Sequence, residues 1–136
     1  MSLSYKTQEG GCLCGAVRFR LLKKPIRRII CHCHTCRKAT GATRVAWVVV
    51  QAGDFIFTNE MPASYESSLG VLRTFCKKCG TSLTYQQLEA PHMIDVTIAS
   101  FDQPAVFAPE VEIWLTHKVA WEIQNITLPQ LPEDYI

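Results

Sequence analysis

The sequence predicts a mainly β protein with little helix, folded as a single domain over residues 1–136. Eight short segments alternate apolar with polar residues or are rich in β-branched residues, and turn residues separate them. No long segment repeats its apolar residues with a helical period. The 136 residues, of which 48% are hydrophobic and 19% charged, suffice for one hydrophobic core and exclude a disordered chain.

Four strands are expected in the first half of the chain. In the segment 16–21, Val17, Phe19 and Leu21 alternate with polar residues and should face the core. The segment 29–31 is a short apolar run that ends at a cysteine. The segment 45–50 is rich in valine, which favours a buried strand, and 54–57 follows a turn.

Four more strands are expected in the second half. The segments 71–75 and 82–85 flank a pair of cysteines and should form a hairpin. The segment 94–99 alternates cleanly, and 111–115 follows a proline. One helical turn is expected over 34–40, and 128–134 is a polar, proline-broken tail. All tryptophans are expected in the core, namely Trp47, Trp114 and Trp121.

The seven cysteines are the most informative residues of the chain: Cys12, Cys14, Cys31, Cys33, Cys36, Cys76 and Cys79. An odd number leaves one over in a full disulfide pairing, and the polar segment 1–10 shows no secretory signal. A reducing compartment, the cytoplasm, is therefore expected, where disulfides do not persist. No apolar run reaches the roughly 18–20 residues of a membrane helix, so no membrane partner is expected.

The cysteine spacing indicates metal binding. The chain reads C-L-C at 12–14, C-H-C-H-T-C at 31–36 and C-K-K-C-G at 76–80. A C-x-x-C turn directs two thiolates toward one tetrahedral ion, and Gly80 supplies the freedom to adopt a positive φ. In extended backbone, side chains at i and i+2 share a side, so C-x-C can also bind one ion.

Seven ligands divide most simply into four and three, which predicts two zinc ions per chain. Cys12, Cys14, Cys76 and Cys79 complete a four-sulfur site of the kind found in structural zinc. Cys31, Cys33 and Cys36 can hold a second ion and leave its fourth position open, as in catalytic zinc. The alternative is that both sites are structural and that one histidine closes the second, the candidates being His32, His34, His92 and His117. If 31–34 is extended, His32 and His34 face away from the cysteines.

Four stretches of this sequence resemble the glutathione-dependent formaldehyde-activating enzyme family, which also includes centromere protein V. They are G-G-C-L-C-G-A-V-R-F (10–19), C-H-C-H-T-C-R-K-A-T-G (31–41), R-T-F-C-K-K-C-G-T-S-L (73–83) and P-E-V-E-I-W (109–114), followed by Lys118 and Trp121. The resemblance covers about residues 8–122 and includes all seven cysteines. It implies a β-tent of small antiparallel sheets. It also implies a structural zinc on Cys12, Cys14, Cys76 and Cys79, and a catalytic zinc on Cys31, Cys33 and Cys36.

The resemblance further implies a carbon–sulfur lyase that adds glutathione to formaldehyde to give S-hydroxymethylglutathione. In this interpretation the open zinc lowers the pKa of a bound thiol. Sequence proximity makes His32, His34, Arg37 and Thr40 candidate helpers, and Arg37 with Lys38 could meet a substrate carboxylate.

Parts of the sequence are compatible with two other functions. The first is a zinc-stabilised binding module without catalysis, similar to centromere protein V, with a basic group at Lys23, Lys24, Arg27 and Arg28. That group lacks interleaved aromatic residues, and the net charge of 14 − 12 = +2 does not favour nucleic acid. The second is a redox enzyme, which the assignment of every cysteine as a metal ligand disfavours.

Overall fold

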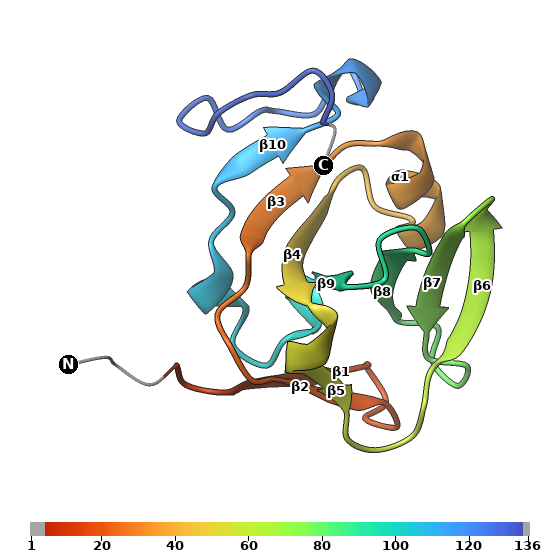
Figure 1. Ribbon diagram of the computed structural model, residues 1–136. Helices are drawn as coiled ribbons and strands as arrows, with labels where there is room; N and C mark the ends of the chain where they lie inside the picture. The colour runs from red at the N-terminus through yellow and green to blue at the C-terminus, as the bar shows by residue number, and fades with distance from the viewer. Residues whose placement is uncertain (1–4, 135–136) are drawn as a thin grey trace.

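The computed structural model describes residues 5–134 and contains, within them, two β-sheets and one α-helix (Figure 1). Seven strands form the larger sheet. In spatial order they are β10 (Val111–Ile113), β3 (Arg27–Cys31), β4 (Val45–Gln51), β9 (Met93–Thr97), β8 (Ser82–Gln87), β7 (Val71–Phe75) and β6 (Ala63–Ser68). A mainly β fold is therefore confirmed.

The smaller sheet lies at the bottom of Figure 1 and packs across one end of the larger sheet. Its strands, in spatial order, are β1 (Gln8–Gly11), β2 (Arg18–Leu21) and β5 (Phe55–Phe57). Every strand pair in the two sheets is antiparallel except β10 with β3, which is parallel. This parallel pair brings the C-terminal part of the chain beside the cysteines that follow β3.

Strand β4 is buried on both faces and divides the interior into two cores. Val48 and Val50 face the small sheet and pack in one core with Phe19. Trp47 and Val49 face the other way and pack in the second core. Each core also contains buried cysteines, Cys12 and Cys76 in the first and Cys31 and Cys36 in the second.

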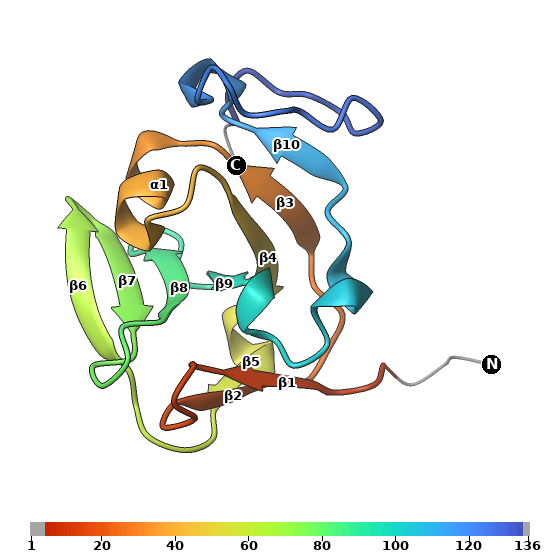
Figure 2. The same cartoon turned by 180° about the vertical axis from the view of Figure 1, so that it is seen from behind.

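Helix α1 (His34–Thr40) has the bounds expected from the sequence, although its seven residues make about two turns and not one, and its ends have clear causes. The Cys33 side chain caps its N-terminus by accepting a hydrogen bond from the Cys36 amide. Gly41 ends it in the left-handed conformation at φ 72°, where its amide reaches back to the Arg37 carbonyl. Figure 2 shows from behind that α1 lies beside the β6–β7–β8 end of the sheet.

Several details differ from the sequence prediction. Strands β1 and β6 were missed because Gln-Glu-Gly-Gly and Ala-Ser-Tyr-Glu-Ser-Ser show no apolar alternation. The expected strand over 94–99 ends at Thr97, and its last residues enter a 3₁₀ turn (Ile98–Ser100). Further 3₁₀ turns are Ala52–Asp54, Pro104–Phe107 and Leu115–His117.

The core predictions are mostly confirmed. Val17, Phe19 and Leu21 are buried, as is Trp47. The prediction for Trp121 is wrong, since its side chain is 72% exposed in the C-terminal segment. Trp114 is half-buried, and it is the only non-glycine residue among 5–134 with a positive φ, at 58°. No helix in the described part of the chain is both long and apolar enough to span a bilayer.

Candidate metal centres and the cavity beside them

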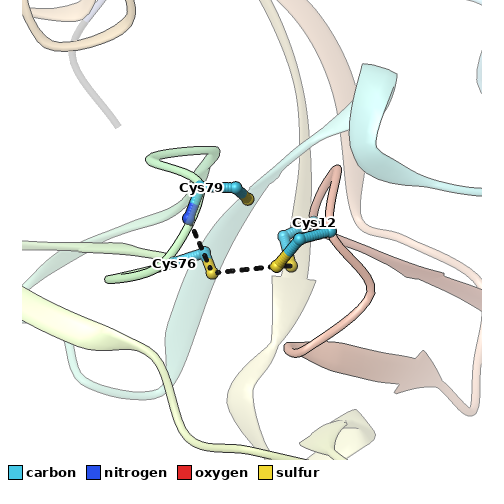
Figure 3. A group of neighbouring side chains, drawn as sticks. Cys12, Cys76 and Cys79 are labelled. Carbon is cyan, nitrogen blue, oxygen red and sulfur yellow. Dashed lines mark hydrogen bonds between the residues drawn. The ribbon is translucent and has the colours of Figure 1, made fainter.

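Four cysteines from two distant loops meet at one point, and we call them the four-cysteine cluster. Cys12 and Cys14 lie in the loop between β1 and β2, and Cys76 and Cys79 lie in the turn between β7 and β8. Their four sulfurs lie within 4.8 Å of one another. Figure 3 shows Cys76 and Cys79 facing Cys12 across the gap between these loops.

The sulfur spacing fits a tetrahedral zinc ion. Sγ of Cys14 is 3.6 Å from that of Cys12 and 3.8 Å from that of Cys76. A zinc–sulfur bond of about 2.3 Å places the corners of a tetrahedron roughly 3.8 Å apart. A disulfide would need about 2.05 Å, so these distances belong to free thiols.

Backbone amides and one threonine support the four-cysteine cluster. Val17 N donates to Cys12 Sγ at 3.2 Å, and the amides of Lys78 and Cys79 donate to Cys76 Sγ. The hydroxyl of Thr81 lies 3.3 Å from Cys79 Sγ and accepts the Leu13 amide from the opposite loop. The hydrogen bond with this hydroxyl lowers the pKa of Cys79 to about 5. Gly80 has a φ of 80°, as the turn was expected to require.

The three-cysteine cluster comprises Cys31 at the end of β3, Cys33 at the helix cap and Cys36 inside α1. Their sulfurs also lie within 4.8 Å of one another. Hydrogen bonds with Cys31 and Cys36 lower the pKa of Cys33, whereas hydrogen bonds with Cys33 and Cys36 raise the pKa of Cys31 well above its usual range. Negative charge therefore develops first on Cys33, which also receives the Cys36 amide at 3.3 Å.

No histidine among residues 5–134 joins either cysteine cluster. His32 is completely buried, with Nε2 2.9 Å from Glu112 Oε1, so it does face away from the neighbouring cysteines. His34 stacks on His117 with ring centroids 3.8 Å apart. His92 is exposed in the turn before β9. Among the residues that the structure describes, the three-cysteine cluster therefore offers three protein ligands and no fourth.

A cavity of about 340 Å³ borders the three-cysteine cluster, and we call it the cysteine cavity. Trp47, Tyr85 and Trp114 give it aromatic walls, and His34 and His117 lie at its border. Its size is within the range of small-molecule sites. A second cavity of about 590 Å³ borders α1 and is lined in part by Lys38 and Thr40. The two cavities share Thr35 and Trp47 in their linings.

The other predicted helpers lie outside the cysteine cavity. Arg37 donates to the His117 carbonyl at 3.2 Å, and Thr40 donates to the Cys36 carbonyl at 2.8 Å. Both side chains therefore brace α1 and the segment after β10. Of the basic group, Arg27 pairs with Asp134 and Arg28 with Glu110, so neither is a free cation.

Arg73 on β7 is a site residue that the sequence reasoning missed. Its exposed fraction is only 7%. Its Nη2 lies 3.9 Å from Cys36 Sγ and 3.3 Å from Thr35 Oγ1, and its guanidinium lies over the Tyr85 ring. The available signal was a charged residue at an inward position of an alternating strand, three residues before a cysteine pair.

Asp95 on β9 was also missed, although it lines the cysteine cavity. It is half-buried, and burial raises its pKa to about 7, while the charges of Arg27 and Arg73 act in the opposite direction. Its alternation with Ile94 and Val96 predicts only which face it occupies. What that face contains depends on how four strands pair, which local sequence does not specify.

Comparison with known proteins agrees with this framework. The family model described as glutathione-dependent formaldehyde-activating enzyme matches residues 7–117. A Schizosaccharomyces pombe protein named "Uncharacterized lyase" is 34% identical over 89 residues, which are 64% of this chain and 64% of that protein. A Halomonas elongata protein named "Putative glutathione-dependent formaldehyde-activating enzyme" is 30% identical over 129 residues, covering 86% of this chain and 81% of that protein.

A crystal structure of a Rhodobacter sphaeroides protein shares the fold, with a TM-score of 0.58 and 20% identity, covering 90% of this chain and 98% of that one. The family model spans both cysteine clusters and most of the chain. This chain is therefore a member of the glutathione-dependent formaldehyde-activating enzyme family.

Proposed function

We propose that this protein is a zinc-dependent carbon–sulfur lyase that adds a small thiol, such as glutathione, to a small aldehyde, such as formaldehyde. The observation that carries the proposal is the cysteine cavity, because three sulfurs without a fourth protein ligand open into it. A structural zinc is usually closed by four protein ligands, as the ion in the four-cysteine cluster would be.

The donor sets fit two zinc ions. The four-cysteine cluster would hold a structural ion through Cys12, Cys14, Cys76 and Cys79, joining the first hairpin to the β7–β8 turn. Cys31, Cys33 and Cys36 would hold a catalytic ion. When bound there, zinc supplies a positive centre that favours the thiolate form of a substrate thiol.

The chain's own residues prepare the site for this chemistry. Arg73 sets a permanent positive charge beside Cys36, which offsets the negative charge of three thiolates. The hydroxyl of Thr35, 3.5 Å from Cys33 Sγ and 3.3 Å from Arg73, orients both groups. Trp47 and Tyr85 exclude water from one side of the cavity, which strengthens the local electrostatic interactions.

The addition itself conserves all atoms. The thiol releases its proton, its sulfur forms a bond to the carbonyl carbon, and the π electron pair of the carbonyl moves to oxygen. That oxygen then takes up a proton, which gives a hemithioacetal such as S-hydroxymethylglutathione. No oxidant or reductant takes part.

The test is an exchange measurement by NMR with ¹³C-formaldehyde and glutathione, since the uncatalysed addition is itself measurable. The wild-type protein with two zinc ions should accelerate exchange above that background in proportion to its concentration. Cys36→Ser should return the rate to the background. A fully metallated, folded wild-type protein that leaves the exchange rate unchanged for glutathione and other thiols would refute the proposed function.

A further inference from the structure

Asp95 is a carboxylate of the cysteine cavity without a partner. Two carboxylates line this cavity, and the other, Asp134, lies 2.6 Å from Arg27 Nη1. Within the described range 5–134, the side-chain carboxylate of Asp95 makes no hydrogen bond and no ion pair. A partly buried carboxylate usually has a hydrogen-bond donor or a cation as its partner. Because the described residues supply neither to Asp95, a bound ligand would be the partner.

The neighbouring cations are engaged elsewhere. Arg27 is bound to Asp134. Arg73 donates from Nε to Ser67 Oγ at 2.9 Å and directs Nη2 toward Thr35 and Cys36. Their charges reach Asp95 only through space. Four charged or titratable groups surround Asp95. Three come from neighbouring strands, Arg27 (β3), Tyr85 (β8) and Arg73 (β7), and the fourth, Asp134, comes from the C-terminal segment.

The strand register separates the backbone of Asp95 from that of Cys31 along the sheet. Asp95 pairs with Val49 on β4, whereas Cys31 pairs with Val45 on the same strand. At about 3.3 Å per residue, these two levels are roughly 13 Å apart between backbones, and the side chains shorten this gap. The cavity thus spans both levels: Cys31 lies at the level of Val45, Asp95 lies at the level of Val49 beside its partner Tyr85, and Trp47 lies between the two levels.

We propose that Asp95 binds the ammonium group of the thiol substrate while the substrate's sulfur lies at the three-cysteine cluster. This inference rests on the proposed function and defines its substrate class: a thiol of peptide size that carries a free ammonium several bonds from its sulfur. With the two backbone levels roughly 13 Å apart, we expect a thiol with a one- or two-carbon spacer to be too short for both contacts. The contact is a charge-assisted hydrogen bond in a partly water-excluded site, which makes it selective for a cation.

The experiment is calorimetric binding, without aldehyde, of glutathione and of N-acetylglutathione, whose ammonium is capped. The zinc-loaded proteins are the wild type, Asp95→Asn and the control Glu89→Gln, which removes an exposed carboxylate near the β8–β9 turn. The wild type should bind glutathione roughly tenfold or more tightly than the capped thiol. Asp95→Asn should lose that preference and bind the capped thiol like the wild type, and Glu89→Gln should preserve it.

Three results would overturn the inference. In the first, the wild type binds both thiols equally or binds neither. In the second, Asp95→Asn loses affinity for both thiols to the same extent. In the third, Asp95→Asn changes the turnover rate but leaves the binding of both thiols unaltered. Equal binding of the two thiols by the wild type overturns the inference even if the variant fails to fold. Binding and NMR exchange also separate the two proposals. Ammonium-dependent binding without faster exchange refutes the enzyme proposal alone, and faster exchange without ammonium preference refutes only the role of Asp95.

Discussion

His32 Nε2 lies 2.9 Å from Glu112 Oε1, and both side chains are completely excluded from solvent. The same carboxylate accepts the Asn125 amide and the Gln130 side chain, each at 2.9 Å. Burial raises the pKa of Glu112, but the hydrogen bonds from His32, Gln130 and Asn125 outweigh it, so the net effect is a lowered pKa. Because His32 lies between Cys31 and Cys33, this pair ties the three-cysteine cluster to β10 and the C-terminal segment.

Replacing Glu112 should therefore disturb both the fold and the adjacent metal centre. Glu112→Ala leaves the buried His32 ring without its acceptor and should lower the free energy of unfolding by about 3 kcal/mol. Glu112→Gln retains an acceptor oxygen and should cost about 1 kcal/mol. The measurements are urea unfolding and a chelator competition for zinc. Equal stability of the alanine and glutamine variants would show that the hydrogen bond to His32 has no structural role.

The two cysteine clusters should respond differently to the loss of one ligand. Cys79→Ser breaks a site that joins segments more than sixty residues apart, and zinc on four thiolates contributes roughly 10 kcal/mol to folding. This variant should be unfolded or insoluble. Cys36→Ser affects ligands that lie within six residues of sequence, so it should lose one zinc and the activity but still melt cooperatively near the wild type.

Elemental analysis, thermal melting and the NMR exchange rate compare these variants directly. The wild type should contain close to two zinc ions, with the three-cysteine cluster the first to be depleted by a chelator. If Cys36→Ser unfolds as readily as Cys79→Ser, both sites are structural and the enzyme proposal loses its main support.

Local chemistry explains which features were predictable from sequence. Cys76 and Cys79 are close in the chain, and their turn needs only a glycine at positive φ, so their spacing already indicates a shared ion. Helix α1 likewise ends at a residue that is recognisable in the sequence, Gly41. The alternation of Val17, Phe19 and Leu21 identifies the buried face of β2.

The features that were missed depend on long-range pairing. Glu112 reaches His32 only because β10 returns to lie parallel to β3, a register that no local pattern specifies. Arg73 and Asp95 lie on the face of the sheet that borders the three-cysteine cluster because β7, β8 and β9 pair in that order. The polar strand β6 forms through backbone hydrogen bonds at the sheet edge, where no apolar alternation is required.

Arg73→Met tests the electrostatic role of the buried guanidinium. Methionine fills a similar space but removes the charge beside Cys36, so three thiolates lose the cation that offsets them. We expect zinc affinity at the three-cysteine cluster to fall by roughly tenfold to a hundredfold, since a charged hydrogen bond is worth about 1.5–3 kcal/mol. The chelator competition reports this change, and Arg18→Met, which removes an exposed ion pair with Asp102, serves as the control. An unchanged affinity in the folded Arg73→Met protein would assign Arg73 to packing against Tyr85 alone.

The stability of the protein should depend on pH through Asp95. Its pKa is raised by burial from 3.8 to about 7 in the folded state, so the folded protein holds a proton that the unfolded chain has already released at pH 5–6. Stability therefore falls as the pH rises from about 4 through 7, because the folded state binds more protons than the unfolded state. Above pH 7 the half-buried carboxylate is charged and unpaired, and it destabilises the fold.

Asp95→Asn removes this penalty without changing the shape of the side chain. The variant should be more stable than the wild type at pH 8 by about 2 kcal/mol, and the difference should shrink toward zero near pH 4. Urea unfolding of both proteins across pH 4–8 gives the difference in their free energy of unfolding. Because the two proteins share the same cysteines, the titration of the cysteines cancels in this difference. The same unfolding measurement can be repeated with thiols present. Glutathione should stabilise the wild type more than the variant at pH 8, because its ammonium supplies the missing partner of the Asp95 carboxylate. A constant difference across this pH range would show that the Asp95 carboxylate is solvated in the folded protein, and it would remove the reason for a cation to bind there.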